Sequence, residues 1–308
     1  MSSPLTVQGF PDNLDSRFFE ITAGEFKEEK DIIGQLFTTK DPDQLTMRGS
    51  GLTPLGLVPE FTGNVTYDGP DQGYAWSATV KEFALGLEIE RKLVQFDQFD
   101  LIEKQWKLLA RSARQTRQTY AIRPFTQAFS VDTAFDYTTD ENLSLCNDAH
   151  TTTRAGVVTT TGFDNAGTAE FSPTSLKSAY ATFRRFKDLA GQPIDENQAT
   201  HVILPPELKL RAEEVFSTMR GLDEATGNKN VLEGEYKIID FIRLTDTNNW
   251  FLVNLPMFKE NHFWFDAEKA EFARMESFDN ITARYRVYSM FGVGRTPIWQ
   301  HCLGFNVS

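Results

Sequence analysis

Alternating apolar and polar residues over positions 74–94 predict an unusually long extended segment. The apolar set changes along it: first Tyr74, Trp76, Ala78 and Val80, and then Phe83, Leu85, Leu87 and Ile89. Because successive side chains of a strand point to opposite faces, the buried face must switch near Lys81-Glu82. A bulge, a distal half that packs on another chain, or two separate short strands would each explain the switch.

If continuous, this segment would reach on the order of 70 Å, far more than an ordinary strand. An extended run over 44–61, interrupted by glycines and prolines, precedes it, and the turn over 62–73 contains Gly63-Asn64 and Asp68-Gly69-Pro70. We therefore predict an extended β-hairpin over 44–94 that protrudes and contacts other chains. The expected inter-subunit contacts on its distal part are Phe61, Tyr67, Tyr74, Trp76 and Val80.

A long amphipathic helix is predicted after the hairpin. Asp97 or Asp100 can cap its start, and Pro124 should end or kink it. Its core-facing stripe consists of Phe99, Ile102, Trp106, Leu109, Ala113, Thr116 and Tyr120. The proximal half of the hairpin, residues 83–89, is expected to pack against this stripe. A basic stripe on the far side, formed by Lys104, Lys107, Arg111 and Arg114, is either a solvated face or a contact for a polyanion or for acidic loops of a neighbour.

The rest of the chain divides into helices and strands that are segregated along the sequence, which is typical of an α+β fold. Residues 1–20 predict an extended arm and residues 22–37 a short helix. Residues 130–173 predict loops and short strands. Further helices are expected over 172–190, where Ser172-Pro173 is a start signal and Gly191 a stop, and from Pro205-Pro206 to about Met219. Strands are expected over 201–204, 236–244, 250–255 and within 263–307.

Composition narrows the class of protein. The chain has 308 residues, 31 basic and 43 acidic, for a formal net charge of −12. This balance argues against a dedicated nucleic-acid binder, whose affinity depends on basic side chains. The 26 phenylalanines indicate extensive packed or subunit-contact surface. We see neither a signal peptide nor an apolar run long enough for a membrane span, so we expect synthesis in the cytoplasm and no membrane partner.

Candidate chemistry is sparse. Cys146 and Cys302 lie far apart in the sequence and are expected to be small buried hydrophobes in a reducing compartment. Cys146 and His150 are the only close Cys/His pair; a soluble hydrolase that uses them is the weakest alternative. Gly292-Val293-Gly294-Arg295 is interpreted as a turn or bulge in a strand. We expect no catalytic residue, no metal and no cofactor.

The order of these elements resembles that of the major capsid protein of tailed bacteriophages. The resemblance spans nearly the whole chain and depends on this order, because each motif alone is weak. The first motif is the outgoing strand from Tyr74-Ala75-Trp76 through Phe83-Ala84-Leu85-Gly86-Leu87-Glu88-Ile89-Glu90-Arg91, which leads into the helix. The second is Leu143-Ser144-Leu145-Cys146-Asn147-Asp148-Ala149-His150. The others are Val202-Ile203-Leu204-Pro205-Pro206-Glu207-Leu208 and the segment from Leu244-Thr245-Asp246 to Trp250-Phe251-Leu252.

The resemblance implies a phage major-capsid fold in named parts. These are an N-terminal arm and short helix (1–43), an extended β-hairpin or E-loop (44–94), a peripheral P-domain with the spine helix (95–140 and 263–308), and an axial A-domain (141–262). It also implies self-assembly into pentamers and hexamers of an icosahedral head around double-stranded DNA, with the virion as location.

Scaffolding, portal and decoration proteins are further implied partners, and the basic stripe could face DNA. The hairpin tip has no lysine, so no cross-linking is expected there. An encapsulin-like nanocompartment shell is the alternative on the same fold.

Overall fold

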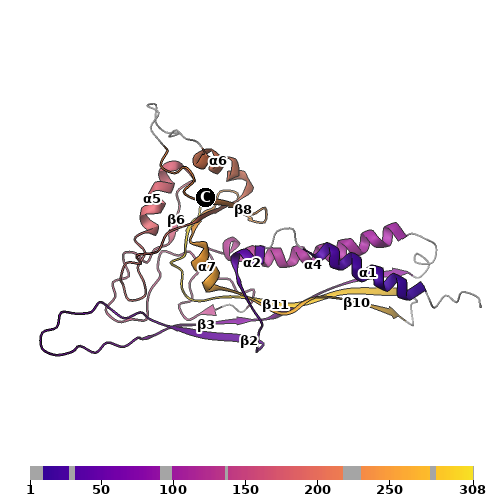
Figure 1. Ribbon diagram of the computed structural model, residues 1–308, viewed down its shortest axis with the longest axis horizontal. Helices are drawn as coiled ribbons and strands as arrows, with labels where there is room; N and C mark the ends of the chain where they lie inside the picture. Colours follow the sequence, from indigo (N-terminus) through magenta and orange to yellow (C-terminus); the bar gives the residue numbers. More distant parts are fainter. Residues whose placement is uncertain are drawn as a thin grey trace, which may run out of the picture.

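The computed structural model describes residues 10–27, 32–90, 99–135, 138–217, 230–277 and 282–307. Figure 1 shows an upper body that carries α5 and α6, a long arm in which α1 and α4 lie beside the strands β10 and β11, and a loop beyond β2 and β3 that projects in the opposite direction. The strands of the described residues form three sheets, ordered β1-β10-β11-β4, β6-β12-β9-β7-β8 and β2-β3-β5. The α+β prediction is confirmed.

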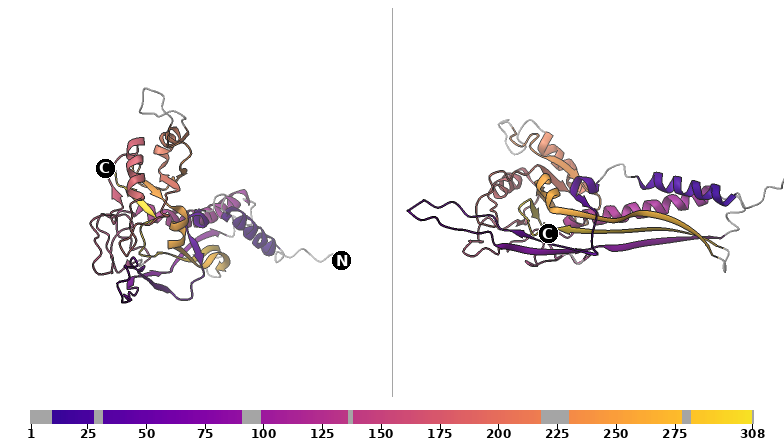
Figure 2. Two further views of the ribbon diagram at one scale, coloured as in Figure 1. Left: turned by 60° about the vertical axis from the view of Figure 1, so that its left-hand side comes forward. Right: turned by 60° about the horizontal axis from the view of Figure 1, so that its bottom comes forward.

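The arm is a layer of helices on a sheet. The strands β10 (His262–Ser277) and β11 (Thr282–Arg295) form a long antiparallel hairpin. The strand β4 (Lys81–Glu90) pairs with β11, and β1 (Thr38–Lys40) pairs with β10. The helices α4 (Phe99–Thr126) and α1 (Phe10–Phe26) lie along one face of this sheet (Figure 2).

The apolar stripe of α4 faces the sheet, as its spacing predicts. Ile102, Trp106 and Leu109 are buried in one cluster with Ile89 of β4 and Tyr285 of β11, and Leu87 packs against it. The predicted packing of the proximal hairpin half on the helix is therefore confirmed. Burial of such side chains contributes about 1.5–3 kcal/mol each, which is why the arm is stable although it extends away from the body.

The long extended segment is two strands that belong to different sheets. The strand β3 (Gln72–Thr79) pairs with β2 (Thr46–Leu52) and with β5 (Thr138–Thr139), whereas β4 starts at Lys81 in the sheet of the arm. Between them, the Val80 N–H donates to the carbonyl of Leu45. The switch of the buried face at Lys81-Glu82 thus marks a change of sheet. Of the three explanations, the two separate strands are correct.

The distal half of that segment packs on its own chain. Ala78 is fully buried against Phe263 and Phe265, with Trp76 packed beside them. The indole of Trp76 lies 5.6 Å from the ring of Phe263, between ring centroids. Ala78 and Val80 are therefore covered by their own chain and are not available to a neighbour, whereas Trp76 is only partly buried.

The strand β3 approaches β11 closely at two glycines. A Cβ at Gly292 would lie 3.1 Å from the carbonyl oxygen of Thr79, and a Cβ at Gly294 would lie 2.9 Å from the Cβ of Ala78. Both glycines lie inside β11 and pair with β10 in regular register, so the interpretation of this motif as a turn or bulge is wrong. A side chain has no room at either position, because the backbone of residues 79 and 80 fills the space at Gly292 and the Ala78 methyl group fills it at Gly294.

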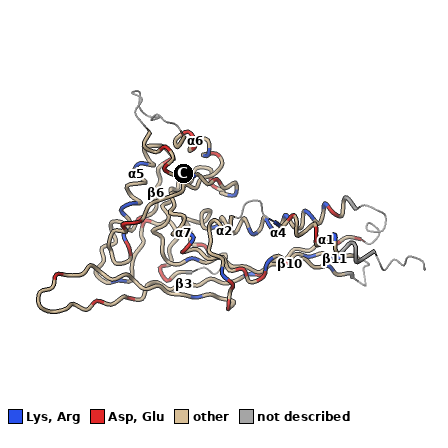
Figure 3. Tube along the Cα trace, viewed as in Figure 1, with Lys and Arg blue, Asp and Glu red and all other residues tan. Residues whose placement is uncertain are grey.

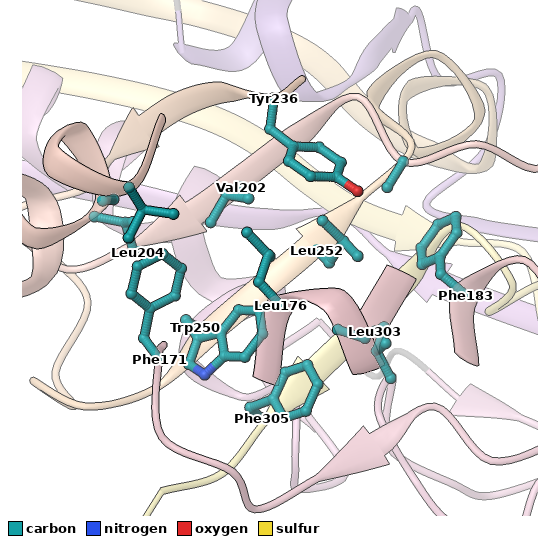
Figure 4. Close-up of a cluster of buried hydrophobic side chains, with 14 of the residues drawn as sticks. Phe171, Leu176, Phe183, Val202, Leu204, Tyr236, Trp250, Leu252, Leu303 and Phe305 are labelled. Carbon is teal, nitrogen blue, oxygen red and sulfur yellow. The ribbon is translucent and has the colours of Figure 1, made fainter. Parts of the chain in front are cut away.

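The upper body has its own core. The helices α5 (Pro173–Phe183) and α6 (Pro206–Ser217) pack on the sheet of β6 (Ala166–Gly167), β7 (His201–Leu204), β8 (Lys237–Asp240), β9 (Trp250–Val253) and β12 (Cys302–Phe305). Figure 4 shows Leu176, Trp250, Leu252 and Phe305 pointing toward one another in this cluster. The rings of Trp250 and Phe305 stack with centroids 3.9 Å apart.

The strand β12 lies apart from the other strands of the range 263–308, which is predicted to belong to the P-domain. It pairs with β9 and β6 in the sheet of the upper body. The long strands β10 and β11 do belong to the arm. The chain therefore passes from the arm back into the body between Arg295 and Cys302.

A third cluster joins the body and the arm. The helices α2 (Ile32–Leu36) and α7 (Leu255–Asn261) contribute to it together with the C-terminal turns of α4. Phe125 stacks on Phe258, with centroids 5.0 Å apart. Beside it, Arg117 of α4 donates two hydrogen bonds of 2.9 Å to Asp266 of β10, and both side chains are nearly fully buried.

Several predicted elements are displaced. Residues 10–20, predicted as part of an extended arm, form most of α1, because Phe18 inserts between Trp106 and Tyr285. The helix α5 ends at Phe183 instead of residue 190, although its Ser172 cap is confirmed by a complete capping box. The helix α4 continues past Pro124 to Thr126. Asp97 and the side chain of Asp100 lie outside the described residues.

The close crossing of β3 over β11 generates a prediction. Gly292→Ala should lower the unfolding free energy of the unassembled subunit by about 1–3 kcal/mol, because the new methyl group meets backbone atoms that cannot rotate away. Urea unfolding followed by tryptophan fluorescence measures the change.

Gly86→Ala is the matched control on the neighbouring strand β4. Its Cβ would meet only the Tyr285 carbonyl oxygen at 3.8 Å, an ordinary contact. We expect a change within about 0.5 kcal/mol there. If both substitutions changed the unfolding free energy equally, the close approach of β3 to β11 at Gly292 would be contradicted.

Candidate functional site

Residues 53–71 project from the molecule as a loop whose two ends are joined. The Thr53 N–H donates to the carbonyl of Asp71 at 2.9 Å, and the Asp71 N–H donates to the Thr53 hydroxyl, also at 2.9 Å. The strands β2 and β3 lead into this closed base. In Figure 1 the loop extends beyond the rest of the chain. The predicted protrusion is therefore present, but as an irregular loop beyond two short strands.

Arg154 fixes the part of the loop next to its base. Its guanidinium donates to the carbonyl of Pro54 at 2.7 Å and forms an ion pair with Asp68. The Gly56 N–H donates to the same carboxylate at 3.2 Å. The hydrogen bond from Arg154, followed by that from Gly56, lowers the pKa of Asp68, so this carboxylate is charged at neutral pH. The two sides of the loop are thereby held together.

Beyond this clamp, the loop exposes apolar side chains to solvent. Phe61 is 70% exposed, Tyr67 is 92% exposed and Val58 is 94% exposed. Leu55, Leu57 and Val65 are also exposed. The charged residues of the loop, Glu60, Asp68 and Asp71, are all acidic (Figure 3). Gathered apolar side chains on a projecting segment are typical of a contact with another protein.

The five predicted contact residues fall into three environments. Phe61 and Tyr67 are on the exposed loop. Tyr74 is partly buried at its base, where its hydroxyl lies 2.7 Å from the Thr151 hydroxyl. Trp76 is partly buried against Ala78 and the phenylalanines of β10, and Val80 is only 5% exposed. Only Phe61 and Tyr67 therefore present large free surfaces, and Val80 is removed from the set by its burial.

The basic stripe of α4 is mostly exposed. Lys104, Lys107 and Arg111 are exposed to solvent on the helix. Arg114 is partly buried and donates to the carbonyl of Glu25 at 3.0 Å, which binds α1 to α4. Three residues of the basic stripe thus face solvent, and the fourth, Arg114, holds α1 against α4.

The Cys146 and His150 alternative has no geometric support. The Nδ1 atom of His150 lies 3.1 Å from a carboxylate oxygen of Glu141, and its Nε2 atom lies 3.3 Å from the carbonyl of Leu145. The imidazole also stacks on Trp299. Burial raises the pKa of the Cys146 thiol, which disfavours a nucleophilic thiolate. A thiol-based hydrolase is therefore rejected.

The two cysteines are both buried, as predicted, but they lie together. Their sulfur atoms are 3.8 Å apart, although the residues are 156 positions apart in the sequence. Within the described ranges, no cluster of three or more His, Cys, Asp or Glu residues could hold a metal ion. A search of the helices in the same ranges finds none long and apolar enough to cross a membrane.

Arg154 is the functional residue that sequence reasoning missed. It follows Thr151-Thr152-Thr153 in a segment interpreted as loops, and its partners lie 86 and 100 positions away. The threonines beside it hold the same base, since the Thr153 hydroxyl donates to the carbonyl of Gln72. A single arginine in a polar run gives no local signal of such distant partners.

The distinctive surface of this chain is a projecting loop with exposed apolar side chains. A family model described as "Phage capsid protein" matches residues 74–300, well over half of the chain. The chain belongs to the phage capsid protein family. It is therefore a structural protein of the virion and not an enzyme. A comparison with curated protein sequences gave no significant match.

Solved capsid structures share the fold. The capsid of a native GTA particle matches with a TM-score of 0.56 and 11% identity over 92% of each chain. The mature capsid of bacteriophage PhiM1 matches with a TM-score of 0.57 and 10% identity, covering 92% of this chain and 88% of that one. The capsid of bacteriophage JBD30, decorated with minor capsid protein trimers, matches with a TM-score of 0.52 and 13% identity, covering 71% and 92%.

The burial of two histidines predicts that the folded subunit loses stability at acid pH. Burial lowers the pKa of His262 to about 3, opposed by a hydrogen bond to the Phe258 carbonyl, and lowers that of His301, next to the charges of His262, Arg295 and His150. Unfolding frees both histidines to bind protons at their ordinary pKa of about 6.5. Stability is therefore full above that pH and should fall by up to about 1.4 kcal/mol per pH unit for each histidine as the pH drops toward 3.

Urea unfolding of the subunit between pH 7.5 and 5 tests this, because few carboxylates titrate in that range. Replacing His262 by Gln should flatten the curve. A free energy of unfolding that stays constant from pH 7.5 to 5 in the natural chain would contradict the argument.

Proposed function

We propose that this chain is the major capsid protein of a tailed phage, and that its pentamers and hexamers close an icosahedral head around double-stranded DNA. The observation that carries the proposal is the projecting loop of residues 53–71. Its apolar side chains have no partner within the described part of the chain, and its base is clamped in one arrangement. A neighbouring copy that covers this surface removes its apolar side chains from water, which favours association.

The named parts of the capsid fold map onto this geometry. We assign β2, β3 and residues 53–71 to the E-loop, α4 to the spine helix, and the sheet of β4, β10 and β11 to the P-domain. The five-stranded sheet with α5 and α6 is assigned to the A-domain. This keeps the proposed ranges 95–140 and 141–262. It limits the E-loop to the part of 44–94 that precedes β4, because β4 pairs with β11, and it moves the end of the chain from the P-domain to the A-domain, because β12 pairs with β9. The range 1–43 keeps the role of an N-terminal arm, with α1 packed on α4.

Contacts between copies are heterologous, since the projecting loop of one copy meets a different surface of the next. Heterologous contacts close into rings when the rotation between subunits permits it, which suits pentamers and hexamers. The net charge of −12 opposes association at long range, so apolar contact must provide the attraction.

Other partners are proposed by analogy. One solved relative, the JBD30 capsid, carries minor capsid protein trimers as decoration. A decoration protein, a scaffolding protein and a portal protein are therefore proposed partners of this chain. DNA is proposed to meet the exposed cations Lys104, Lys107 and Arg111 by contacts that do not depend on base sequence.

Electron microscopy of the purified chain tests the assembly. We expect rings or closed shells, and we expect the variant Phe61→Ser/Tyr67→Ser to form a folded subunit that assembles poorly. Loss of each buried apolar side chain costs about 1.5–3 kcal/mol, so the concentration needed for assembly should rise more than tenfold. Light scattering measures this threshold.

Asn64→Ser is the matched control in the same loop and should assemble normally. Small monodisperse oligomers of the natural chain under every condition would overturn the capsid assignment. Small shells filled with a specific protein instead of DNA would favour the encapsulin-like alternative. Unchanged assembly of the double variant would remove the loop from the contact but leave the family assignment in place.

The DNA contact is tested by salt dependence. Replacing Lys104, Lys107 and Arg111 by Gln should reduce the slope of log affinity against log salt by about 0.9 for each lost phosphate contact, measured by fluorescence anisotropy with duplex DNA. The control, Lys177→Gln/Arg211→Gln/Lys237→Gln, removes the same charge from exposed positions of the upper body. If the two triple variants had equal slopes of log affinity against log salt, DNA binding would depend on net charge and not on the basic stripe of α4.

A further inference from the structure

The two cysteines form a buried pair. The Sγ atoms of Cys146 and Cys302 are 3.8 Å apart, in van der Waals contact, and the residues are 2% and 0% exposed. A disulfide has an S–S distance of about 2.05 Å, so closure requires an approach of roughly 1.8 Å. Rotation of a cysteine side chain moves its sulfur by a distance of this order.

One buried side chain holds the two backbones together. The amide nitrogen of Asn165 donates to the carbonyl of Leu145 and to the carbonyl of Cys302, each at 2.9 Å. Its oxygen accepts from the Asn147 N–H at 2.8 Å. Asn165 thus binds the residues on both sides of Cys146 as well as Cys302 itself. The spacing between the two cysteines is therefore set by the fold and is not an accident of side-chain orientation.

The strand β12 leaves room for the sulfur of Cys146. A Cβ at Gly304 would lie 2.7 Å from this sulfur. Residues 302 and 304 share one face of β12, because side chains of a strand alternate. The Cys146 sulfur thus lies on the same face of β12 as Cys302, where any side chain at position 304 would displace it.

We propose that Cys146 and Cys302 are a latent intrachain disulfide, open in a reducing compartment and closed by a small peroxide once the particle leaves it. Thiols are kept reduced in the cytosol and are oxidised outside it. The bond would join the segment that follows α4 to the last strand of the upper body. The proposal depends on the fold of one chain and is independent of the loop contacts proposed above.

The reaction balances with hydrogen peroxide as the oxidant. The thiolate of one cysteine, formed when a local opening exposes its sulfur to water, attacks the O–O bond. This gives a sulfenic acid, and the released hydroxide takes up the thiol proton to form one water molecule. The second sulfur then displaces the hydroxyl group, so that the S–S bond forms and a second water molecule leaves with the remaining thiol proton. The two sulfurs lose two electrons in all, and the peroxide accepts them.

A pocket lies close to the pair. Its lining includes Leu145, the neighbour of Cys146, and Arg295, but neither cysteine. The guanidinium of Arg295 is buried and interacts electrostatically with Cys302. Both sulfurs are buried, so the proposal requires a local opening of this region that admits a small peroxide.

Mass spectrometry of the folded protein after peroxide treatment tests the proposal. With alkylation in denaturant, we expect the loss of both free thiols, a mass lower by two hydrogen atoms, and a peptide that links Cys146 to Cys302. The closed loop is long, so the midpoint of thermal unfolding should rise by about 5 °C and return after reduction.

The variants Cys146→Ser and Cys302→Ala are the matched controls and should show no such rise. If either variant fails to fold, the linked peptide of the natural chain still decides the question. Two thiols that stay free, sulfinic acids without a link, or links only between different chains would each overturn the proposal.

Discussion

The long hairpin of β10 and β11 is the constraint on which the rest of the structure depends. Near the tip of the arm, β11 packs through Tyr285 on Trp106 and Phe18. Farther along, Phe291 stacks on Trp264 and Phe83, with centroids 4.8 Å and 4.4 Å away. At Gly292 and Gly294 the other sheet crosses it. One hairpin therefore takes part in separate cores and determines how the arm and the projecting loop lie relative to each other.

The buried pair of Arg117 and Asp266 lies where these contacts meet. Removing two charges from water is costly, and good bidentate geometry is needed to offset it. Arg117 also lies over the rings of Trp264 and Phe291, at 5.2 Å and 5.6 Å from their centroids. A buried ion pair often adds little net stability compared with apolar packing, but the two parallel hydrogen bonds require that Arg117 of α4 lies opposite Asp266 of β10.

The parts of the fold that sequence could predict are those with local periodic signals. The stripe of α4, the Ser172 cap and the strand His201–Leu204 have such signals and are confirmed. The helix α1 has none of comparable strength, because its stability depends on Phe18 packing against residues far along the chain. The alternation over residues 74–94 left three explanations open, and two separate strands, β3 and β4, were only one of them. Alternation shows which side chains share a face, but it does not show to which sheet a strand belongs. Arg154 and the Cys146–Cys302 pair depend wholly on distant partners and could not be found from local patterns.

The clamp at the base of the projecting loop links local structure to assembly. A free loop would lose conformational entropy on binding, and this loss would reduce the affinity gained from its apolar side chains. Arg154, Asp68 and the Thr53–Asp71 hydrogen bonds restrict the loop before any neighbour arrives, so less entropy remains to be lost. The exposed apolar residues then contribute about 25 cal/mol per Å² when a neighbour covers them. Since copies with a net charge of −12 repel one another, a pre-ordered apolar contact is the kind of interaction that can join them.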